Sequence, residues 1–296
     1  MAKLIDGKAI AKALRASVTE QATRLSEAGV VPGLAVILVG DDPASEIYVR
    51  NKERAASKAG VNAQTIRYDA ETAEETLLAK IAELNADTSV DAILVQSPVP
   101  GHIDEHKIQE AISPAKDVDG FHPENIGRLY ANREGYYPIA NTPRGIMTML
   151  AHEGVTLAGK NVVIIGRSIL VGRPMFALAQ AADATVSLLH RYTPDNLRHE
   201  LLQQADVVIV ATGVAGLVTG SDLKAGATVI DVGINRMADG SLVGDVDFAS
   251  AEPVAGLITP VPGGVGPMTI ATLLQTTVEL AALHHGVTLE AGWQTI

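Results

Sequence analysis

The sequence predicts an α/β fold in two domains, with mostly parallel strands covered by helices. The chain has 296 residues, more than one hydrophobic core usually serves. Its residues are 47% hydrophobic but only 3% aromatic, so small and branched aliphatic residues dominate, as is typical of buried parallel strands. Segments with strand and helix patterns alternate along the chain, which favours βαβ units.

The first half shows this alternation clearly. Helical spacing over residues 8–29 stops at Gly29, with Pro32 just beyond it. The segments that follow read as strands at 34–40, 64–69 and 91–96, and as helices at 43–59 and 74–85. Residues 113–145 are rich in Pro, Gly, Asn and Asp, so we interpret them as a functional loop and a crossing between domains.

The alternation resumes after this loop. The second half reads as strands at 160–166, 184–190, 206–212 and 227–233, with helices from Gly172 and over 196–204. A long amphipathic helix then runs from Pro267 to Gly286 and is expected to pack back on the first domain. We therefore expect a first domain of residues 1–140 with 267–296, and a second domain of residues 141–266.

Composition excludes several classes of protein. The net charge of −11 argues against nucleic acid as a partner, because a phosphate backbone requires a basic surface. The absence of cysteine excludes disulfides and thiolate metal sites. No apolar run approaches the 18 residues of a membrane span, and the first residues lack a signal-like apolar segment. We expect a soluble cytoplasmic protein with no membrane partner.

The helix at 43–59 carries Tyr48 and Lys52 one turn apart, so both project from one face. A solvated lysine on a surface helix is the simpler explanation, and these residues alone do not exclude it.

A phosphate-binding turn is predicted in "VVIIGRSILVGRPM". Branched residues end at Gly166, a short loop follows, and Gly172 opens a helix whose amides can meet a pyrophosphate. A tight structural turn is the alternative, because the spacing is not G-x-G-x-x-G. The P-loop-like "GVTLAGK" at 154–160 is rejected, since it precedes a strand where a phosphate cradle must follow one.

The strand at 184–190 is followed by a base where an NAD site would have an acid. Arg191, with Arg167 in the preceding loop, suits a 2′-phosphate, which favours NADP over NAD. A solvated Arg191 remains the alternative. His102 and His106 lack a zincin pattern and a third ligand, so no metal is expected, and the chain has no G-x-S-x-G nucleophile motif.

Seven motifs occur in a recognisable order along the chain. They are "YVRNK", "VQSPVPGH", "KDVDGFHPENIGRL", "TPRGI", "GRSILVGRPM", "ATVIDVGIN" and "PVPGGVGPMT". Together they resemble the bifunctional methylenetetrahydrofolate dehydrogenase/methenyltetrahydrofolate cyclohydrolase family over nearly the whole chain. The resemblance implies an N-terminal catalytic domain, a C-terminal Rossmann-like domain that binds NADP, a folate cleft between them, and a homodimer.

The resemblance also implies roles for individual residues. Lys52 would be the catalytic lysine, Tyr48 would lie over the folate ring system, and Gln96 would hydrogen-bond near Lys52. Asp119 would hold the pterin, and the loop containing Pro262 and Gly263 would border the folate. The residues implied to bind the cofactor are Gly166, Arg167, Ser168, Gly172, Arg191 and Ile234, the last by backbone contacts near the nicotinamide.

The chain departs from the family pattern at three points. Ser97 stands where the family usually has Leu, which could change the polarity of the cleft beside Gln96. Ala140 and Asn141 stand where the family usually has Pro-Cys, and we expect that neither change removes a group that the chemistry needs. The cofactor strand ends in "HRYT" where some members have "HSKT", which leaves NADP selectivity dependent on Arg191.

These residues suit the two reactions that the resemblance implies. Oxidation of the methylene carbon is a positioning task, because the flanking nitrogens stabilise the cation formed. Hydrolysis of the methenyl product needs proton transfer, for which a lysine is useful only when burial lowers its pKa. Two alternatives remain at this stage: a dehydrogenase without the hydrolytic activity, and a non-catalytic regulatory protein that binds NADP.

Overall fold

The computed structural model describes residues 1–295, and of Pro43 and Ala44 it describes only the backbone. Ile296, the last residue of the expected 267–296 segment, lies outside the described residues. The chain forms two compact units. The three-stranded unit comprises Lys12–Asn141 and Ile270–Ile296, and the six-stranded unit comprises Met1–Ala11 and Thr142–Thr269. The unit boundaries fall within the helices α1 (Gly7–Glu27), α6 (Asn141–His152) and α10 (Val265–His284).

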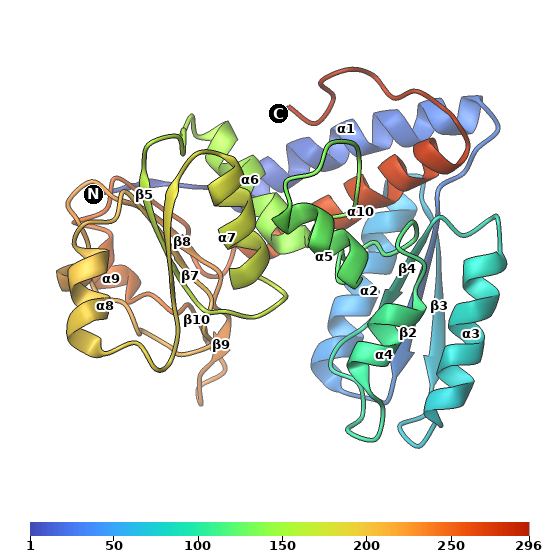
Figure 1. Cartoon of the computed structure of the whole chain (residues 1–296), viewed down its shortest axis with the longest axis horizontal. Coiled ribbons are helices and arrows are strands. Elements are labelled where there is room, and N and C mark those ends of the chain that lie inside the picture. The colour runs from blue at the N-terminus through green and yellow to red at the C-terminus, as the bar shows by residue number, and fades with distance from the viewer. Residues whose placement is uncertain (296) are drawn as a thin grey trace. The chain divides into compact units, whose positions relative to one another are not determined.

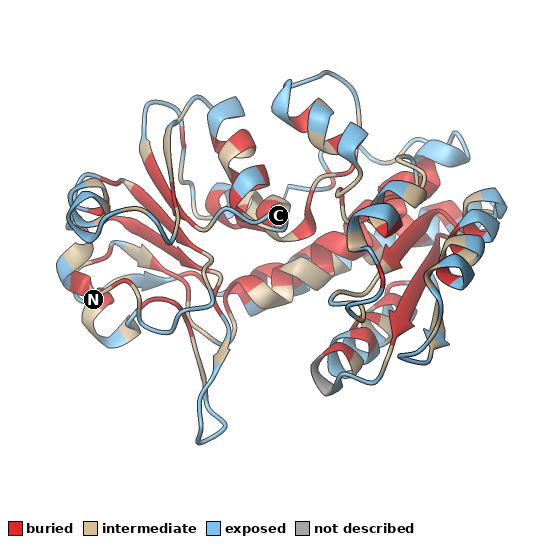
Figure 2. Ribbon diagram, turned by 60° about the horizontal axis from the view of Figure 1, so that its bottom comes forward, coloured by how far each residue is buried: buried red, intermediate tan, exposed pale blue. Residues whose placement is uncertain are grey.

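The three-stranded unit is built on a parallel sheet in the order β3-β2-β4 over the described residues. Its further elements are β2 (Gly33–Val39), α2 (Pro43–Lys58), β3 (Asn62–Tyr68), α3 (Glu74–Ala86), β4 (Ala92–Val95), α4 (Glu105–Ala111) and α5 (Pro123–Tyr130). Every residue of the central strand β2 is buried, which explains its unbroken apolar run; buried residues are red in Figure 2. Leu77 and Ile81 of α3 and Ile108 of α4 pack in one core cluster with Ile37 of this strand.

The six-stranded unit contains a parallel sheet in the order β1-β11-β8-β7-β5-β6 within the described chain. Its elements are β1 (Lys3–Leu4), β5 (Asn161–Ile165), α7 (Gly172–Ala181), β6 (Thr185–Leu189), α8 (Asp195–Leu202), β7 (Val207–Val210), η1 (Gly220–Asp222), β8 (Thr228–Asp231), α9 (Phe248–Ala251) and β11 (Leu257–Ile258), with the antiparallel pair β9 (Asn235–Arg236) and β10 (Leu242–Val243). Figure 1 shows β5, β7 and β8 of this unit with α7 beside them.

Strand order determines where each unit can bind a ligand. Within the sheet, β6 lies on one side of β5, and β7, which comes later in the chain, lies on the other side of β5. Ligands of open α/β sheets bind at such a switch point, beyond the carboxyl ends of the strands. The three-stranded unit repeats the arrangement, with β3 and β4 on opposite sides of β2.

The structure differs from the sequence-based expectation at the start of the chain. Residues 1–11 were expected in the first domain, but they lie in the six-stranded unit because Lys3 and Leu4 pair with Leu257 and Ile258. The segment 113–145, expected to be a loop, contains the short helix α5 and the first turns of α6. His122 caps α5, since its Nδ1 accepts a hydrogen bond from the Glu124 amide.

Candidate active site

Lys52 lies on the side of α2 that faces the protein interior. The helix begins after Asp42, whose carboxylate accepts a hydrogen bond from the Ser45 amide at 2.8 Å. Lys52 is only 8% exposed, and the nearby positions Val49 and Ala56 are fully buried. Tyr48, one turn before Lys52, is 40% exposed. The solvated-lysine alternative is therefore wrong, and a ring and a buried amine share this part of the helix.

Gln96 holds the lysine from the end of β4. Its backbone amide donates to Ile37 O at 2.8 Å, which anchors it at the carboxyl edge of the sheet. Lys52 Nζ donates to Gln96 Oε1 at 2.9 Å, and Gln96 Nε2 donates to Ser97 O at 2.7 Å. The expected pairing of Gln96 with Lys52 is present, and the second bond fixes the amide with its oxygen toward the amine.

Burial and charge act in opposite directions on the two ionisable groups. Burial lowers the pKa of Lys52, while the nearby carboxylate of Asp119 pulls it upward. Burial raises the pKa of Asp119 to about 6, while the charge of Lys52 opposes the rise. At neutral pH Asp119 is therefore mostly ionised, and the lysine is closer to proton exchange than a solvated lysine would be.

Asn141 is attached directly to this site. Its Nδ2 donates to Asp119 Oδ1 at 2.9 Å and to Val118 O at 3.1 Å, and its Oδ1 accepts from Thr276 Oγ1 at 3.2 Å. Asn141 therefore orients the Asp119 carboxylate, a connection that the sequence did not show. The two residues are 22 positions apart, so no local motif connects them. That the departures at Ala140 and Asn141 replace no group needed by the chemistry stays a prediction.

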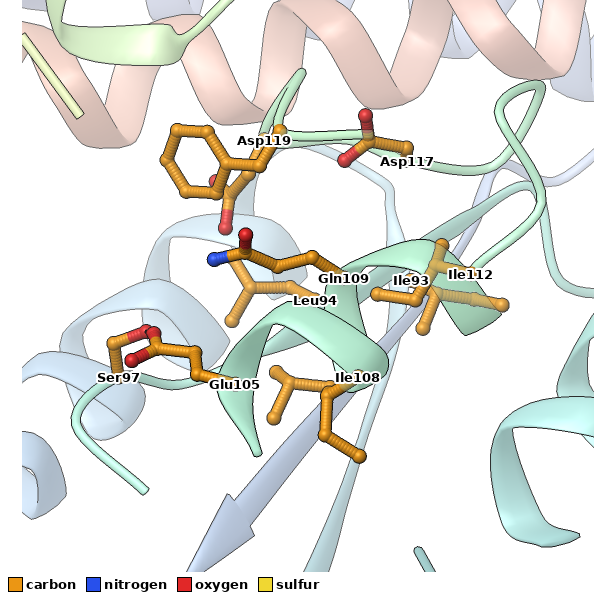
Figure 3. A pocket seen from close by; sticks show the side chains of 11 residues that line it. Ile93, Leu94, Ser97, Glu105, Ile108, Gln109, Ile112, Asp117 and Asp119 are labelled. Atoms are coloured by element: carbon orange, nitrogen blue, oxygen red, sulfur yellow. The ribbon is translucent and has the colours of Figure 1, made fainter. Parts of the chain in front are cut away.

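A small cavity of about 20 Å³ lies beside this group, enough for about one water molecule. Ser97 and Glu105 face each other on one side of it, and Asp119 lies on another (Figure 3). The Ser97 hydroxyl donates to Glu105 Oε1. Ser97 is thus paired with a carboxylate of α4, and its effect on the polarity of the folate cleft stays a prediction.

The loop before α10 carries the two remaining residues predicted to touch folate. Pro262 and Gly263 lie in the six-stranded unit. Gly263 has φ of 112°, and a Cβ there would lie 3.1 Å from Lys8 Cε, so glycine suits this position. Their contact with folate remains a prediction.

A cavity of about 680 Å³ opens at the switch point of the six-stranded sheet. Four of the predicted cofactor residues, Gly166, Arg167, Ser168 and Arg191, line it. Ile234 is 51% exposed and is not among the described residues that line this cavity, so its role near the nicotinamide stays a prediction.

The loop between β5 and α7 fits a pyrophosphate. Gly166 has φ of 121°, and a Cβ there would lie 2.2 Å from Ala211 O. A Cβ on Gly172 would lie 1.9 Å from Gly166 O. Both glycines are thus required for the close backbone approach that opens the helix N-terminus to a phosphate. Ser168 Oγ accepts from the Val171 amide at 3.2 Å and closes the turn.

Other cavity residues were not predicted from the sequence. They follow the ends of β6 and β7 or lie on α8: His190, Thr193, Asp195, Arg198, Ala211, Thr212 and Val214. The rule that ligands meet the carboxyl ends of parallel strands could have indicated Thr212. Arg198 could not be distinguished from any surface arginine, because only the fold brings it to the cavity; its ion pair with Asp195 at 2.8 Å is a local pair within α8.

Other types of site were also considered. Across the described residues, no group of three His, Cys, Asp or Glu side chains could hold a metal ion. His102 instead contacts Thr72 O through Nε2 at 2.9 Å. In residues 1–295, no helix combines the length and apolar character needed to cross a membrane.

Comparisons with known proteins agree with this geometry. The catalytic-domain profile of tetrahydrofolate dehydrogenase/cyclohydrolase matches residues 5–119, and the NAD(P)-binding-domain profile matches residues 140–285. The bifunctional protein FolD of Lactiplantibacillus plantarum is 58% identical over 281 residues, covering 95% of this chain and 98% of its own.

Two solved structures extend the comparison. The bifunctional methylenetetrahydrofolate dehydrogenase/cyclohydrolase FolD of Campylobacter jejuni is 44% identical, with a TM-score of 0.94 over 96% of this chain and 99% of its own. The Trypanosoma brucei enzyme, solved with NADP cofactor and an inhibitor, is 37% identical, with a TM-score of 0.91 over 95% of this chain and 98% of its own.

Proposed function

This chain belongs to the tetrahydrofolate dehydrogenase/cyclohydrolase family, and we propose that Lys52 is the centre of its hydrolytic reaction. The protein oxidises 5,10-methylenetetrahydrofolate with NADP and hydrolyses the 5,10-methenyl product to 10-formyltetrahydrofolate. The observation that supports the proposed centre is the buried Lys52 amine, held at 2.9 Å by the oriented amide of Gln96.

The oxidation requires mainly positioning. The hydride acceptor is supplied by NADP, and the two nitrogens that flank the methylene carbon stabilise the charge left on it. We assign to Tyr48 the face of the folate ring system, because its ring is partly exposed one turn from Lys52. Asp119, ionised and held by Asn141, can accept two hydrogen bonds from the aminopyrimidine edge of the pterin.

The hydrolysis requires a proton to move twice. Water adds to the methenyl carbon and loses a proton, which the neutral Lys52 amine can accept. The bond from this carbon to N5 then breaks as the remaining hydroxyl proton is lost to water, and the proton held by Lys52 passes to N5, leaving the formyl group on N10 and releasing one proton overall. Burial favours the neutral amine, and Gln96 Oε1 keeps the nitrogen in one orientation between these transfers.

The cofactor residues divide by the part of NADP that they serve. We assign Gly166, Ser168 and Gly172 to the pyrophosphate, Arg167 and Arg191 to the 2′-phosphate, and the backbone of Ile234 to the nicotinamide end. The phosphate assignments are supported by the cavity at the switch point and by Gly166 and Gly172, where the neighbouring backbone leaves no room for a Cβ.

An assay with purified protein tests the function directly. Methylenetetrahydrofolate should reduce NADP much faster than NAD, and methenyltetrahydrofolate absorbance should decay faster with enzyme than in buffer. NADP reduction without enzymatic loss of the methenyl compound would indicate a dehydrogenase alone. NADP binding without turnover of either folate would contradict both activities.

We also propose that the protein acts as a homodimer in the cytoplasm, as the family resemblance implies. Sedimentation equilibrium of the full chain should give twice the mass of 30.9 kDa. A single species at the mass of one chain would contradict the dimer.

A further inference from the structure

An exposed tyrosine stands beside the cofactor cavity and contacts both arginines assigned to the 2′-phosphate. Tyr192 follows β6, is 67% exposed, and is not among the described residues that line the cavity. We propose that Tyr192 is a positioning residue for NADP selectivity, which holds Arg167 and Arg191 at the cavity wall through its ring and hydroxyl. This inference rests on the proposed role of Arg191 in phosphate binding.

The contacts to Arg191 are of two kinds. Its guanidinium carbon lies 4.8 Å from the centre of the Tyr192 ring, within the range of a cation–π interaction. Its Nη2 also donates a hydrogen bond to the Tyr192 hydroxyl at 2.9 Å. Arg167, from the loop after β5, has its guanidinium carbon 5.8 Å from the same ring centre. One ring thus connects two cations from different loops.

The backbone around Tyr192 is ordered by a tight turn. His190 N donates to Thr193 Oγ1 at 3.1 Å, and Thr193 N donates to His190 O at 2.8 Å. Tyr192 N donates to His190 Nδ1 at 3.2 Å, and the two rings meet edge to face with centroids 6.1 Å apart. The turn therefore holds the backbone at Tyr192, and His190 packs against one edge of the exposed ring.

Holding the two guanidinium groups matters because arginine side chains are flexible and repel each other. A free arginine loses considerable side-chain entropy when it binds a phosphate, and two converging guanidinium groups disfavour one another. The negative face of an aromatic ring offsets that repulsion and holds both groups before the ligand arrives. A ligand without the 2′-phosphate gains nothing from this arrangement, so the ring should act on selectivity and not on general cofactor affinity.

The test compares Tyr192→Leu, Tyr192→Phe and Arg191→Ala in the full-length protein. Binding of 2′,5′-ADP and of 5′-AMP is measured by calorimetry, together with kcat/KM for NADP and NAD. Loss of one to two exposed cation–π contacts in Tyr192→Leu should raise the Kd of 2′,5′-ADP roughly 5-fold and leave that of 5′-AMP unchanged. Tyr192→Phe keeps the ring but loses the hydroxyl acceptor, so its effect should be smaller.

The controls separate the possible failures. Tyr130→Leu removes an exposed tyrosine of the three-stranded unit and should change neither Kd. If Arg191→Ala lowers the NADP preference and Tyr192→Leu does not, the inference is overturned and the phosphate assignment survives. If Arg191→Ala leaves the preference unchanged, the assignment fails and the inference fails with it. Equal weakening of both nucleotides by Tyr192→Leu would also overturn the inference.

Discussion

Lys52 is held between two opposing influences. Burial disfavours its charged form, and the Asp119 carboxylate favours it. A solvated lysine would stay protonated at neutral pH, whereas the net lowering of the Lys52 pKa brings the amine closer to the range in which it can accept and return a proton.

Replacing the Lys52 amine should impair hydrolysis and leave cofactor binding intact. Lys52→Met keeps an unbranched apolar side chain but removes the proton acceptor, so hydrolysis of methenyltetrahydrofolate should fall about 100-fold or more. NADP affinity, measured by calorimetry, should remain unchanged. Lys58→Met is the matched control, because Lys58 is an exposed lysine of the same helix. Loss of NADP binding in Lys52→Met would mean that the lysine has been placed in the wrong site.

Removing the charge at Asp119 should shift the pH profile of hydrolysis. The carboxylate raises the pKa of Lys52, so Asp119→Asn should lower that pKa further and move the acid limb of kcat toward lower pH. Loss of a charged hydrogen-bond acceptor should also raise KM for the folate about 10-fold. The profile is measured between pH 5 and 9. An unchanged acid limb would show that the charge does not reach the amine.

The sequence predicted the residues of this site better than their connections. Tyr48 and Lys52 were placed on one helix by their spacing, and the family resemblance implied that Gln96 hydrogen-bonds near Lys52. The hydrogen bonds from Asn141 to Asp119 and from Ser97 to Glu105 were not predicted. Both pairs lie outside helical spacing, so only the packed fold shows which polar groups meet.

At the scale of elements, the loop from β5 to α7 shows how backbone shape determines a binding site. The order of strand, glycine, loop and helix was readable from the sequence, because each part has its own residue preference. The structure adds the reason why the glycines are needed: a Cβ on Gly166 would meet Ala211 O just after β7, and a Cβ on Gly172 would meet Gly166 O. Sequence spacing alone did not distinguish this arrangement from an ordinary tight turn.

A side chain at Gly166 should therefore act on cofactor binding. Gly166→Ala forces a Cβ to within 2.2 Å of Ala211 O at a positive φ, so the loop must shift and NADP affinity should fall at least 10-fold. Strain should also lower the free energy of unfolding in urea by about 1–3 kcal/mol. Gly226→Ala shares the positive φ but meets open space, and it should lose stability without losing NADP affinity. Equal affinities in the two variants would contradict this role of the loop.

Long elements were predicted and short ones were missed, for a physical reason. Strands such as β2 and β7 have continuous branched apolar runs that local pattern detects. The two-residue strands β1 and β11 have no detectable period, and their pairing is set by contact between opposite ends of the chain. The helix α5 was hidden in a segment rich in Pro and Gly, where its cap at His122 was the available signal.

At the scale of the whole molecule, an acidic protein binds an anionic cofactor by local means. The chain has a net charge of −11, yet three arginines, Arg167, Arg191 and Arg198, line the cavity at the switch point. Gly166 and Ser168, from the loop between β5 and α7, line it as well. Overall charge therefore argues against a polyanion such as nucleic acid as a partner, but it does not determine the sign of the local field. The sequence feature that pointed to an anionic ligand was Arg191, the basic residue after β6 in the six-stranded unit.

Two buried carboxyl groups should give the folded protein an unusual dependence on pH. Burial raises the pKa of Asp119 and of Asp231 to about 6, from an ordinary value of 3.8. Between these values the folded state keeps protons that the unfolded chain has released. The contribution of these groups to stability is thus complete below about pH 4 and is lost as the pH rises through 6. Carboxyl groups with lowered pKa, such as Asp206, act with the opposite sign below pH 3.8.

Asp231→Asn isolates one of these contributions. Asp231 is 4% exposed, and its carboxylate accepts hydrogen bonds at 2.9 Å from the amides of Gly233, Asp245 and Val246. The variant should be less stable throughout, because an amide cannot accept all three bonds, but it cannot titrate. Urea unfolding at intervals between pH 4 and 6.5 should therefore show a loss of stability in the wild type that exceeds the loss in the variant by on the order of 1 kcal/mol. Parallel curves for the two proteins would show that Asp231 stays ionised across this range, because its three amide donors outweigh the cost of burying its charge.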